Sequence, residues 1–146
     1  MNMVQVYIKG QEDKELSSFL RYYPVRIKNI GMDAFFDRQV IYDFKDGRNH
    51  ADVAKCVAKM LVKVVGERTV VHGTKVKKDE REKRLKEKNN IEVDANFFKN
   101  KIVCIWDDVV TTGTSFCAYT AQLEQVGAHV TNGIFLGKTS YKYVQQ

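Results

Sequence analysis

The stretch from 101 to 126, KIVCIWDDVVTTGTSFCAYTAQLEQV, constrains the fold more than any other part of the chain. It opens with the apolar run 102–106, and a run this short and apolar is typical of a strand buried on both faces. Asp107 and Asp108 follow, and then two valines and a turn of small hydroxyl residues. After the turn, apolar residues recur at helical spacing, namely Phe116, Tyr119, Leu123 and Val126. Because Gly127 ends the helix, the predicted order is strand, acidic pair, loop and helix.

The turn has the chemistry of a phosphate site. Its members are small or carry hydroxyl groups: Thr111, Thr112, Gly113, Thr114 and Ser115. The first N–H groups of a helix have no partner within the helix and lie at its positive dipole end, a setting that favours phosphate. The carboxylates of Asp107 and Asp108 suit sugar hydroxyls or a hydrated Mg²⁺. Because open parallel sheets bind ligands at the carboxyl ends of their strands, we expect a sugar phosphate here.

Residues 103–115, VCIWDDVVTTGTS, resemble the phosphoribosyl pyrophosphate loop of type I phosphoribosyltransferases. The flanks at 97–101 and 123–128 resemble the ComF-like, competence-associated branch of that family. The resemblance covers 97–139, with weaker agreement back to Tyr42. It implies an α/β fold, a three-layer Rossmann-like sandwich with a mainly parallel central sheet. It also implies one domain over 1–146, with hood or edge elements in 1–37 and the core in 38–139.

The resemblance also implies roles for these residues. The loop 111–115 would hold the ribose 5′-phosphate, and Asp107 and Asp108, the candidate catalytic residues, would hold the 2′ and 3′ hydroxyls. The reaction is then transfer of a phosphoribosyl group between phosphoribosyl pyrophosphate or a nucleoside monophosphate and a nitrogenous base. Mg²⁺ would arrive with the pyrophosphate. No metal site built from protein ligands alone is visible, although both acids can reach a metal through water. The sequence does not identify the acceptor base.

A competing phosphate motif is the P-loop, G-x-x-x-x-G-K-[ST]. Gly137, Lys138 and Thr139 match its end. The first glycine would have to stand at position 132, which is Asn132, and Gly133 comes one residue too late. We therefore reject a P-loop NTPase.

The residues that would bind the pyrophosphate are harder to identify in the sequence than those of the phosphate loop. Gly73, Thr74 and Lys75 follow a predicted strand at 67–72, where the family has its pyrophosphate loop; an ordinary turn explains them equally well. The polar run 75–90 lies where these enzymes carry a mobile loop that closes over the reactants, although most such runs are solvated surface. Its candidate cations for the leaving group are Lys77, Lys78, Arg81 and Arg84.

The resemblance has a gap between His72 and the polar run. ComF-like proteins carry there a proline-bearing loop, an arginine-rich turn, a helix and a strand. Either the fold is shortened here or the sequence lacks a segment. This gap favours a second hypothesis, a non-catalytic sensor of a nucleotide or phosphoribosyl compound.

Charge prompts a third hypothesis, an accessory role in DNA uptake. The net charge is +6, and Lys75 to Lys88 contains eight basic and four acidic residues. The interspersed acids halve the charge of this run, so we do not expect direct binding of nucleic acid. The oligomeric state stays open, a homodimer included.

Composition and the remaining patterns complete the expectations. With 44% hydrophobic residues, no stretch of transmembrane length and no signal-peptide pattern, the chain predicts a cytoplasmic protein without a membrane partner. Cys56, Cys104 and Cys117 are scattered, and we interpret them as packing thiols, two of them buried. The predicted elements elsewhere are a strand at 3–8, a helix at 12–23, core-packing Phe35 and Phe36, a strand or the lead into one at 38–44, a helix at 49–65, sheet-packing Phe97 and Phe98, and a strand at 129–136.

Overall fold

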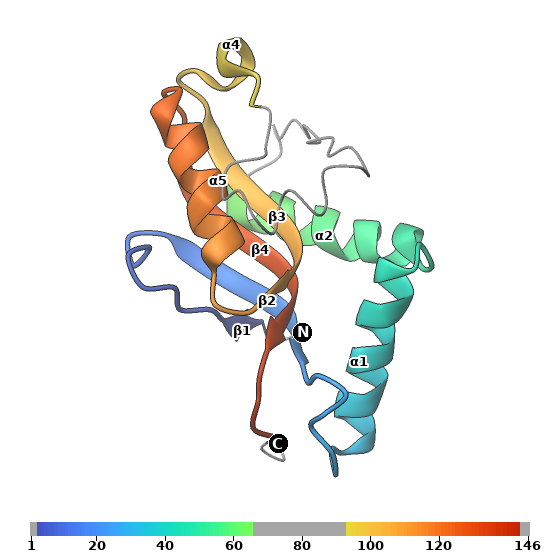
Figure 1. The fold of residues 1–146 in the computed structure, drawn as a ribbon. Helices are drawn as coiled ribbons and strands as arrows, with labels where there is room; N and C mark the ends of the chain where they lie inside the picture. Colours follow the sequence, from blue (N-terminus) through green and yellow to red (C-terminus); the bar gives the residue numbers. More distant parts are fainter. Residues whose placement is uncertain (1–2, 66–92, 144–146) are drawn as a thin grey trace.

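The computed structural model describes residues 3–65 and 93–143, and within them an open four-stranded sheet organises the chain (Figure 1). Its strands are β1 (Val4–Gln5), β2 (Glu15–Tyr22), β3 (Ile102–Val110) and β4 (His129–Thr139). Their order across the sheet is β1-β2-β4-β3. β2, β4 and β3 run parallel, and β1 pairs antiparallel with β2. The described chain is therefore an α/β protein with a mixed, mostly parallel sheet, as the sequence predicts at that level.

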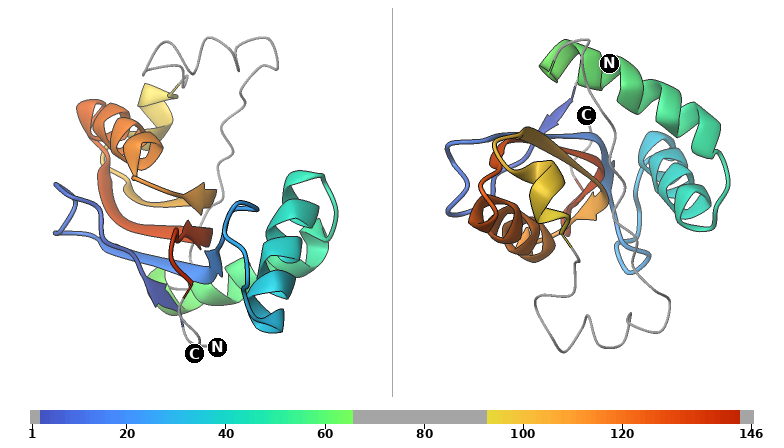
Figure 2. Two further views of the ribbon diagram at one scale, coloured as in Figure 1. Left: turned by 60° about the horizontal axis from the view of Figure 1, so that its bottom comes forward. Right: turned by 90° about the horizontal axis from the view of Figure 1, so that it is seen from above.

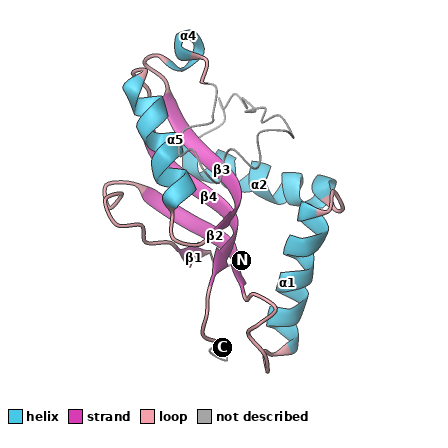
Figure 3. Ribbon diagram, in the orientation of Figure 1, coloured by secondary structure: helices cyan, strands magenta, loops and turns pink. Residues whose placement is uncertain are grey.

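Helices cover both faces of this sheet (Figures 1 and 2). The helices are α1 (Met32–Lys45), α2 (His50–Val65), α4 (Ala95–Phe98) and α5 (Thr114–Gln125), and Figure 3 separates them from the strands by colour. On one face, α5 and α4 pack Phe116, Leu123 and Phe98 against the sheet. On the other face, α1 and α2 contribute Ile41, Val53 and Val57. The sheet thus separates two hydrophobic cores.

β4 is an inner strand, flanked by β2 and β3, and it contributes to both cores. Its side chains alternate between them, because Phe135 packs on the α5 side while Ile134 and Leu136 pack on the α1 and α2 side. Gly133 leaves room for α5, since a Cβ atom there would lie 2.7 Å from Cε2 of Phe116. The predicted strand at 129–136 is confirmed and continues to Thr139.

β3 begins where the sequence predicts but extends further. The strand continues through Asp107 and Asp108 to Val110, so the acids lie within it. The prediction that this strand is buried on both faces is wrong for the first residue of β3, because Ile102 is 75% exposed. The reason is that β3 forms an edge of the described sheet and pairs there with β4 alone.

The helix predicted at 12–23 is wrong, because Glu15–Tyr22 is the strand β2. Leu16 packs in the α5 core, whereas Phe19 and Leu20 pack in the opposite core, so β2 is apolar on both faces and its spacing imitates a helix. The first predicted strand shrinks to Val4–Gln5.

The strand predicted at 38–44 is also wrong, because these residues belong to α1. Core packing of Phe35 and Phe36 is wrong too, since they are 49% and 57% exposed. Arg38 joins α1 to the segment after β2: its guanidinium donates to the carbonyl oxygens of Tyr23 (2.6 Å), Pro24 (3.1 Å) and Ile27 (2.9 Å).

Several other expectations are met. The helix predicted at 49–65 is confirmed as α2, and Phe98 packs against the sheet with Phe97 beside it. Of the cysteines, Cys104 and Cys117 are partly buried, whereas Cys56 is exposed and is not a packing thiol. No helix in the described ranges is long and apolar enough to cross a membrane.

Candidate functional site

The candidate site is the loop that leads from β3 into α5. Gly113 is the residue before the helix, with a left-handed φ of 88° that side chains rarely adopt. A Cβ atom there would also lie 2.6 Å from Cγ2 of Ile8, which is buried. Glycine is therefore required at position 113 for two reasons, backbone conformation and space.

The amide groups at the start of α5 are available to a ligand. The first helical hydrogen bond runs from the Cys117 N–H to the Gly113 carbonyl, at 2.9 Å. The N–H groups of residues 113–116 have no hydrogen-bond acceptor among the described residues. Since free N–H groups project from the amino end of a helix, they form a donor cluster suited to an anion.

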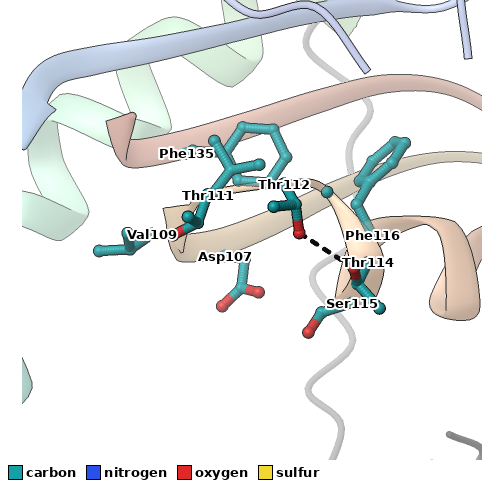
Figure 4. Close-up of a pocket in the computed structure, with 10 residues that line it drawn as sticks. Asp107, Val109, Thr111, Thr112, Thr114, Ser115, Phe116 and Phe135 are labelled. Atoms are coloured by element: carbon teal, nitrogen blue, oxygen red, sulfur yellow. Dashed lines mark hydrogen bonds between the residues drawn. The ribbon is translucent and has the colours of Figure 1, made fainter. Parts of the chain in front are cut away.

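A pocket of about 130 Å³ lies at this donor cluster (Figure 4). Its lining residues come from the end of β3, the loop, the first turn of α5 and β4: Asp107, Val109, Val110, Thr111, Thr112, Gly113, Thr114, Ser115, Phe116 and Phe135. Phe116 and Phe135 are almost fully buried and meet edge to face, 5.7 Å between ring centroids. Their rings form an apolar wall on one side of the pocket.

The hydroxyl groups of the loop divide into two sets. Thr112 Oγ1 and Thr114 Oγ1 lie 3.0 Å apart at the pocket, and the Ser115 hydroxyl lies on the side of the Asp107 carboxylate (Figure 4). Thr111 Oγ1 instead forms a 2.8 Å hydrogen bond with Thr139 Oγ1 on β4. The structure thus brings the predicted residues 111–115 together, and Thr111 also fastens the loop to the sheet.

The two acids lie in different places. Asp107 lines the pocket and Asp108 is not among the lining residues, because consecutive residues of a strand point to opposite faces. The Asp107 carboxylate accepts a hydrogen bond from the Asp108 N–H at 2.8 Å. The Asp108 carboxylate accepts one from the Val109 N–H at 2.7 Å. Of the predicted pair, Asp107 alone joins the loop at the pocket.

Lys138 and Thr139 are site residues that the sequence reasoning missed. The Lys138 ammonium group donates to the Thr111 carbonyl at 2.9 Å, and burial lowers the pKa of this lysine. The sequence contains one hint of their role, because a lysine and a threonine follow the apolar residues at the end of the last predicted strand, in FLGKT. The sequence does not show that they lie beside the loop, because their position depends on the parallel pairing of β4 with β3 in the tertiary structure.

The predicted pyrophosphate and mobile-loop residues lie outside the described residues. They are Gly73, Thr74, Lys75, Lys77, Lys78, Arg81 and Arg84, together with the predicted strand at 67–72. Within the part of the chain that the structure describes, no group of three or more His, Cys, Asp or Glu side chains could hold a metal ion.

Known proteins offer no match: no family model, no curated protein and no solved structure matches this chain. A function can therefore be proposed only from the residues and geometry of the pocket and from the sequence resemblance.

Proposed function

We propose that this protein binds the phosphate group of a phosphoribosyl compound at residues 111–115 and acts as a phosphoribosyltransferase. The observation that carries the proposal is the cluster of free N–H groups at residues 113–116, which opens on a pocket bordered by Asp107. A phosphate accepts several hydrogen bonds at once and is favoured by the positive end of the helix dipole. The Ser115 hydroxyl adds a further donor, and so does one of the Thr112 and Thr114 hydroxyls, because the other donates to its neighbour.

The size of the pocket fits a phosphate ester. A cavity that holds one water molecule has a volume of about 10–15 Å³, measured in the same way as the pocket volume. A pocket of about 130 Å³ therefore has room for a phosphate group and the first atoms of an attached sugar. Asp107 borders the same space, and its carboxylate can accept hydrogen bonds from a ribose hydroxyl.

The transferase chemistry asks for positioning and electrostatics rather than a protein nucleophile. A nitrogen nucleophile attacks C1 of the ribose, the C1–O bond breaks, and pyrophosphate departs with the bonding electron pair. Positive charge develops on the sugar ring, and the Asp107 carboxylate would offset it. Mg²⁺ bound to the pyrophosphate would neutralise the leaving group. The loop amides would hold the 5′-phosphate in place throughout.

A non-catalytic sensor is the second candidate function. The observation that favours it is that the pocket contains only one of the two acids that the transferase resemblance assigns to the ribose. A sensor needs the phosphate donors and one sugar contact, which the pocket has.

Calorimetry separates these functions. We expect phosphoribosyl pyrophosphate and ribose 5-phosphate, each with Mg²⁺, to bind the wild-type chain more tightly than inorganic phosphate does. Pyrophosphate release is then followed over a panel of purine and pyrimidine bases. Binding with release supports the transferase, and binding without release supports the sensor. No binding of either ribose phosphate at millimolar concentration would overturn both.

Gly113→Ala and Gly127→Ala form a matched pair for this experiment. Both glycines have a left-handed φ, 88° and 94°, but Gly127 lies at the other end of α5, away from the pocket. We expect binding to be lost in the first variant and kept in the second.

A further inference from the structure

Lys138 lies in a row of residues that crosses the sheet beside the loop. In the parallel pairing, Lys138 on β4 is opposite Val110 on β3 and opposite Arg21 on β2. Residues paired in this way share a face of the sheet. Val110 packs in the α5 core, and a Cβ atom at Gly137, the residue before Lys138, would lie 2.5 Å from Cδ1 of Ile41 on the opposite face, so the row lies on the face that carries the pocket. Two cations are therefore neighbours in this row, and one of them, Lys138, contacts the loop.

The Lys138 hydrogen bond fixes the orientation of one loop peptide. Its ammonium group donates to the Thr111 carbonyl at 2.9 Å. The C=O and N–H of a trans peptide unit point in opposite directions, and the described chain contains no cis peptide. The N–H of Thr112, in the same peptide unit, therefore points away from the lysine. A carbonyl that accepts from a cation also polarises its own peptide and makes that N–H a stronger donor.

The positive charge of this row lacks a neutralising partner in the described chain. Neither Lys138 nor Arg21 forms an ion pair there, and Nε of Arg21 is buried with no hydrogen-bond partner among the described residues. Burial lowers the pKa of Lys138, which means that the protein environment disfavours its charged form. An anion in the adjacent pocket would favour the charged form by direct attraction.

We propose that Lys138 is a positioning residue for anion binding, which holds the Thr111–Thr112 peptide with its N–H available to the ligand and gains charge stabilisation when the anion binds. This inference rests on the proposed phosphate site. It adds a residue that acts through the loop backbone, and it makes ligand affinity depend on the protonation of one lysine.

The direction of the pH dependence follows from linkage. In the free protein the pKa of Lys138 is lowered, and a bound anion raises it. Affinity is therefore constant at pH values below the free-state pKa of Lys138 and falls as the pH rises through it. A phosphate ester is already fully ionised above about pH 7, so it does not produce this fall.

Charged residues on the elements around the loop do not reproduce the effect. They are Arg21 on β2, Asp107 on β3 and Lys9, which follows the Ile8 that contacts Gly113; the first turn of α5 has no charged residue. Arginine and aspartate ordinarily titrate far from the range of pH 7 to 10. Lys9 is exposed and is tested separately by Lys9→Gln.

The experiment measures the affinity for ribose 5-phosphate by calorimetry between pH 7 and 10 in wild type, Lys138→Gln and Lys138→Arg. Lys142→Gln is the matched control, because Lys142 is an exposed lysine four residues further along. We expect Lys138→Gln to bind about tenfold more weakly at pH 7, since a hydrogen bond to a charged group is lost. Lys138→Arg should keep the affinity and lose the fall at high pH, because a guanidinium stays protonated. Circular dichroism and thermal melting establish that each variant is folded.

Each outcome decides the inference. Wild-type affinity and an unchanged pH profile in Lys138→Gln would overturn it while leaving the phosphate site intact. An equal loss in Lys142→Gln or Lys9→Gln would also overturn it, because a general charge effect would then explain the result. If wild type binds no ribose 5-phosphate, the proposed function fails first and the inference fails with it. If Lys138→Gln does not fold, Lys138→Arg decides: a wild-type fall in affinity at high pH in that variant would contradict the role of Lys138.

Discussion

The hydroxyl oxygens of Thr111 and Thr139 lie 2.8 Å apart, which fastens the first residue of the proposed phosphate loop to the last residue of β4. Thr139 is buried, whereas Thr111 is exposed. Together with the bond from Lys138 to the Thr111 carbonyl, this contact ties the loop to β4 at two consecutive residues. The conformation of the loop therefore depends on a strand that follows it by almost thirty residues.

A double-mutant cycle tests this contact. Thr111→Val and Thr139→Val each remove one hydroxyl, and we expect a coupling energy of about 0.5–1.5 kcal/mol, the usual net value of a hydrogen bond. Urea unfolding of wild type, both single variants and the double variant measures it. Additive effects of the two substitutions would show that the contact does not stabilise the fold.

Gly113→Ala should reduce stability by at least about 2 kcal/mol. The substitution forces alanine into a left-handed conformation and brings its methyl group against Ile8. Gly127→Ala is the control, because its φ is similar but the nearest atom to a Cβ there is 3.7 Å away. We expect only about 1–2 kcal/mol for the control. Equal melting temperatures for the two variants would argue against the Ile8 contact.

Asp107→Asn and Asp108→Asn should differ in their effect on the ligand. We expect Asp107→Asn to weaken binding of ribose 5-phosphate or to slow pyrophosphate release by at least about tenfold, which corresponds to about 1.4 kcal/mol. Asp108→Asn should have a smaller effect, because Asp108 is not among the residues that line the pocket. The two variants are compared at the same ligand concentrations. A larger loss in Asp108→Asn would contradict the assignment of the ribose contact to Asp107.

The cysteines should differ in reactivity. Burial raises the pKa of Cys104 to about 11, so at pH 8 only about one molecule in a thousand carries the thiolate. Cys56 is exposed on α2. We expect iodoacetamide to modify Cys56 first in the folded protein, as seen by peptide mass spectrometry. The order is checked with Cys56→Ser, which should react slowly overall; rapid modification of Cys104 in that variant would be inconsistent with its burial.

Arg38→Met should destabilise the protein by about 2–3 kcal/mol. The substitution keeps the apolar stem and removes a charged group that donates to three backbone carbonyls. Arg48→Met is the matched control: its guanidinium is exposed and pairs with the half-buried Asp43 and the exposed Asp46, so we expect a change within about 0.5 kcal/mol. Chemical unfolding of both variants provides the comparison.

Local sequence patterns correctly predicted helices that bury one face only or that begin and end at a glycine. The amphipathic helix α2 shows its apolar spacing in the sequence, and α5 is bounded by Gly113 and Gly127. The same patterns failed for β2 and α1. β2 is apolar on both faces because it lies between two cores, and α1 buries only Ala34 and Ile41, too few positions to show a helical period.

The sequence by itself determined the composition of the proposed phosphate loop: a strand, an acidic pair, a glycine and hydroxyl residues before a helix, because these are consecutive residues and need no distant partner. Only the tertiary structure decided that β2 is a strand, that Asp107 and not Asp108 borders the pocket, and that Lys138 and Thr139 hold the loop. Each of these depends on β4 pairing with segments remote in sequence, and such pairing is set by burial of the whole sheet rather than by local preference.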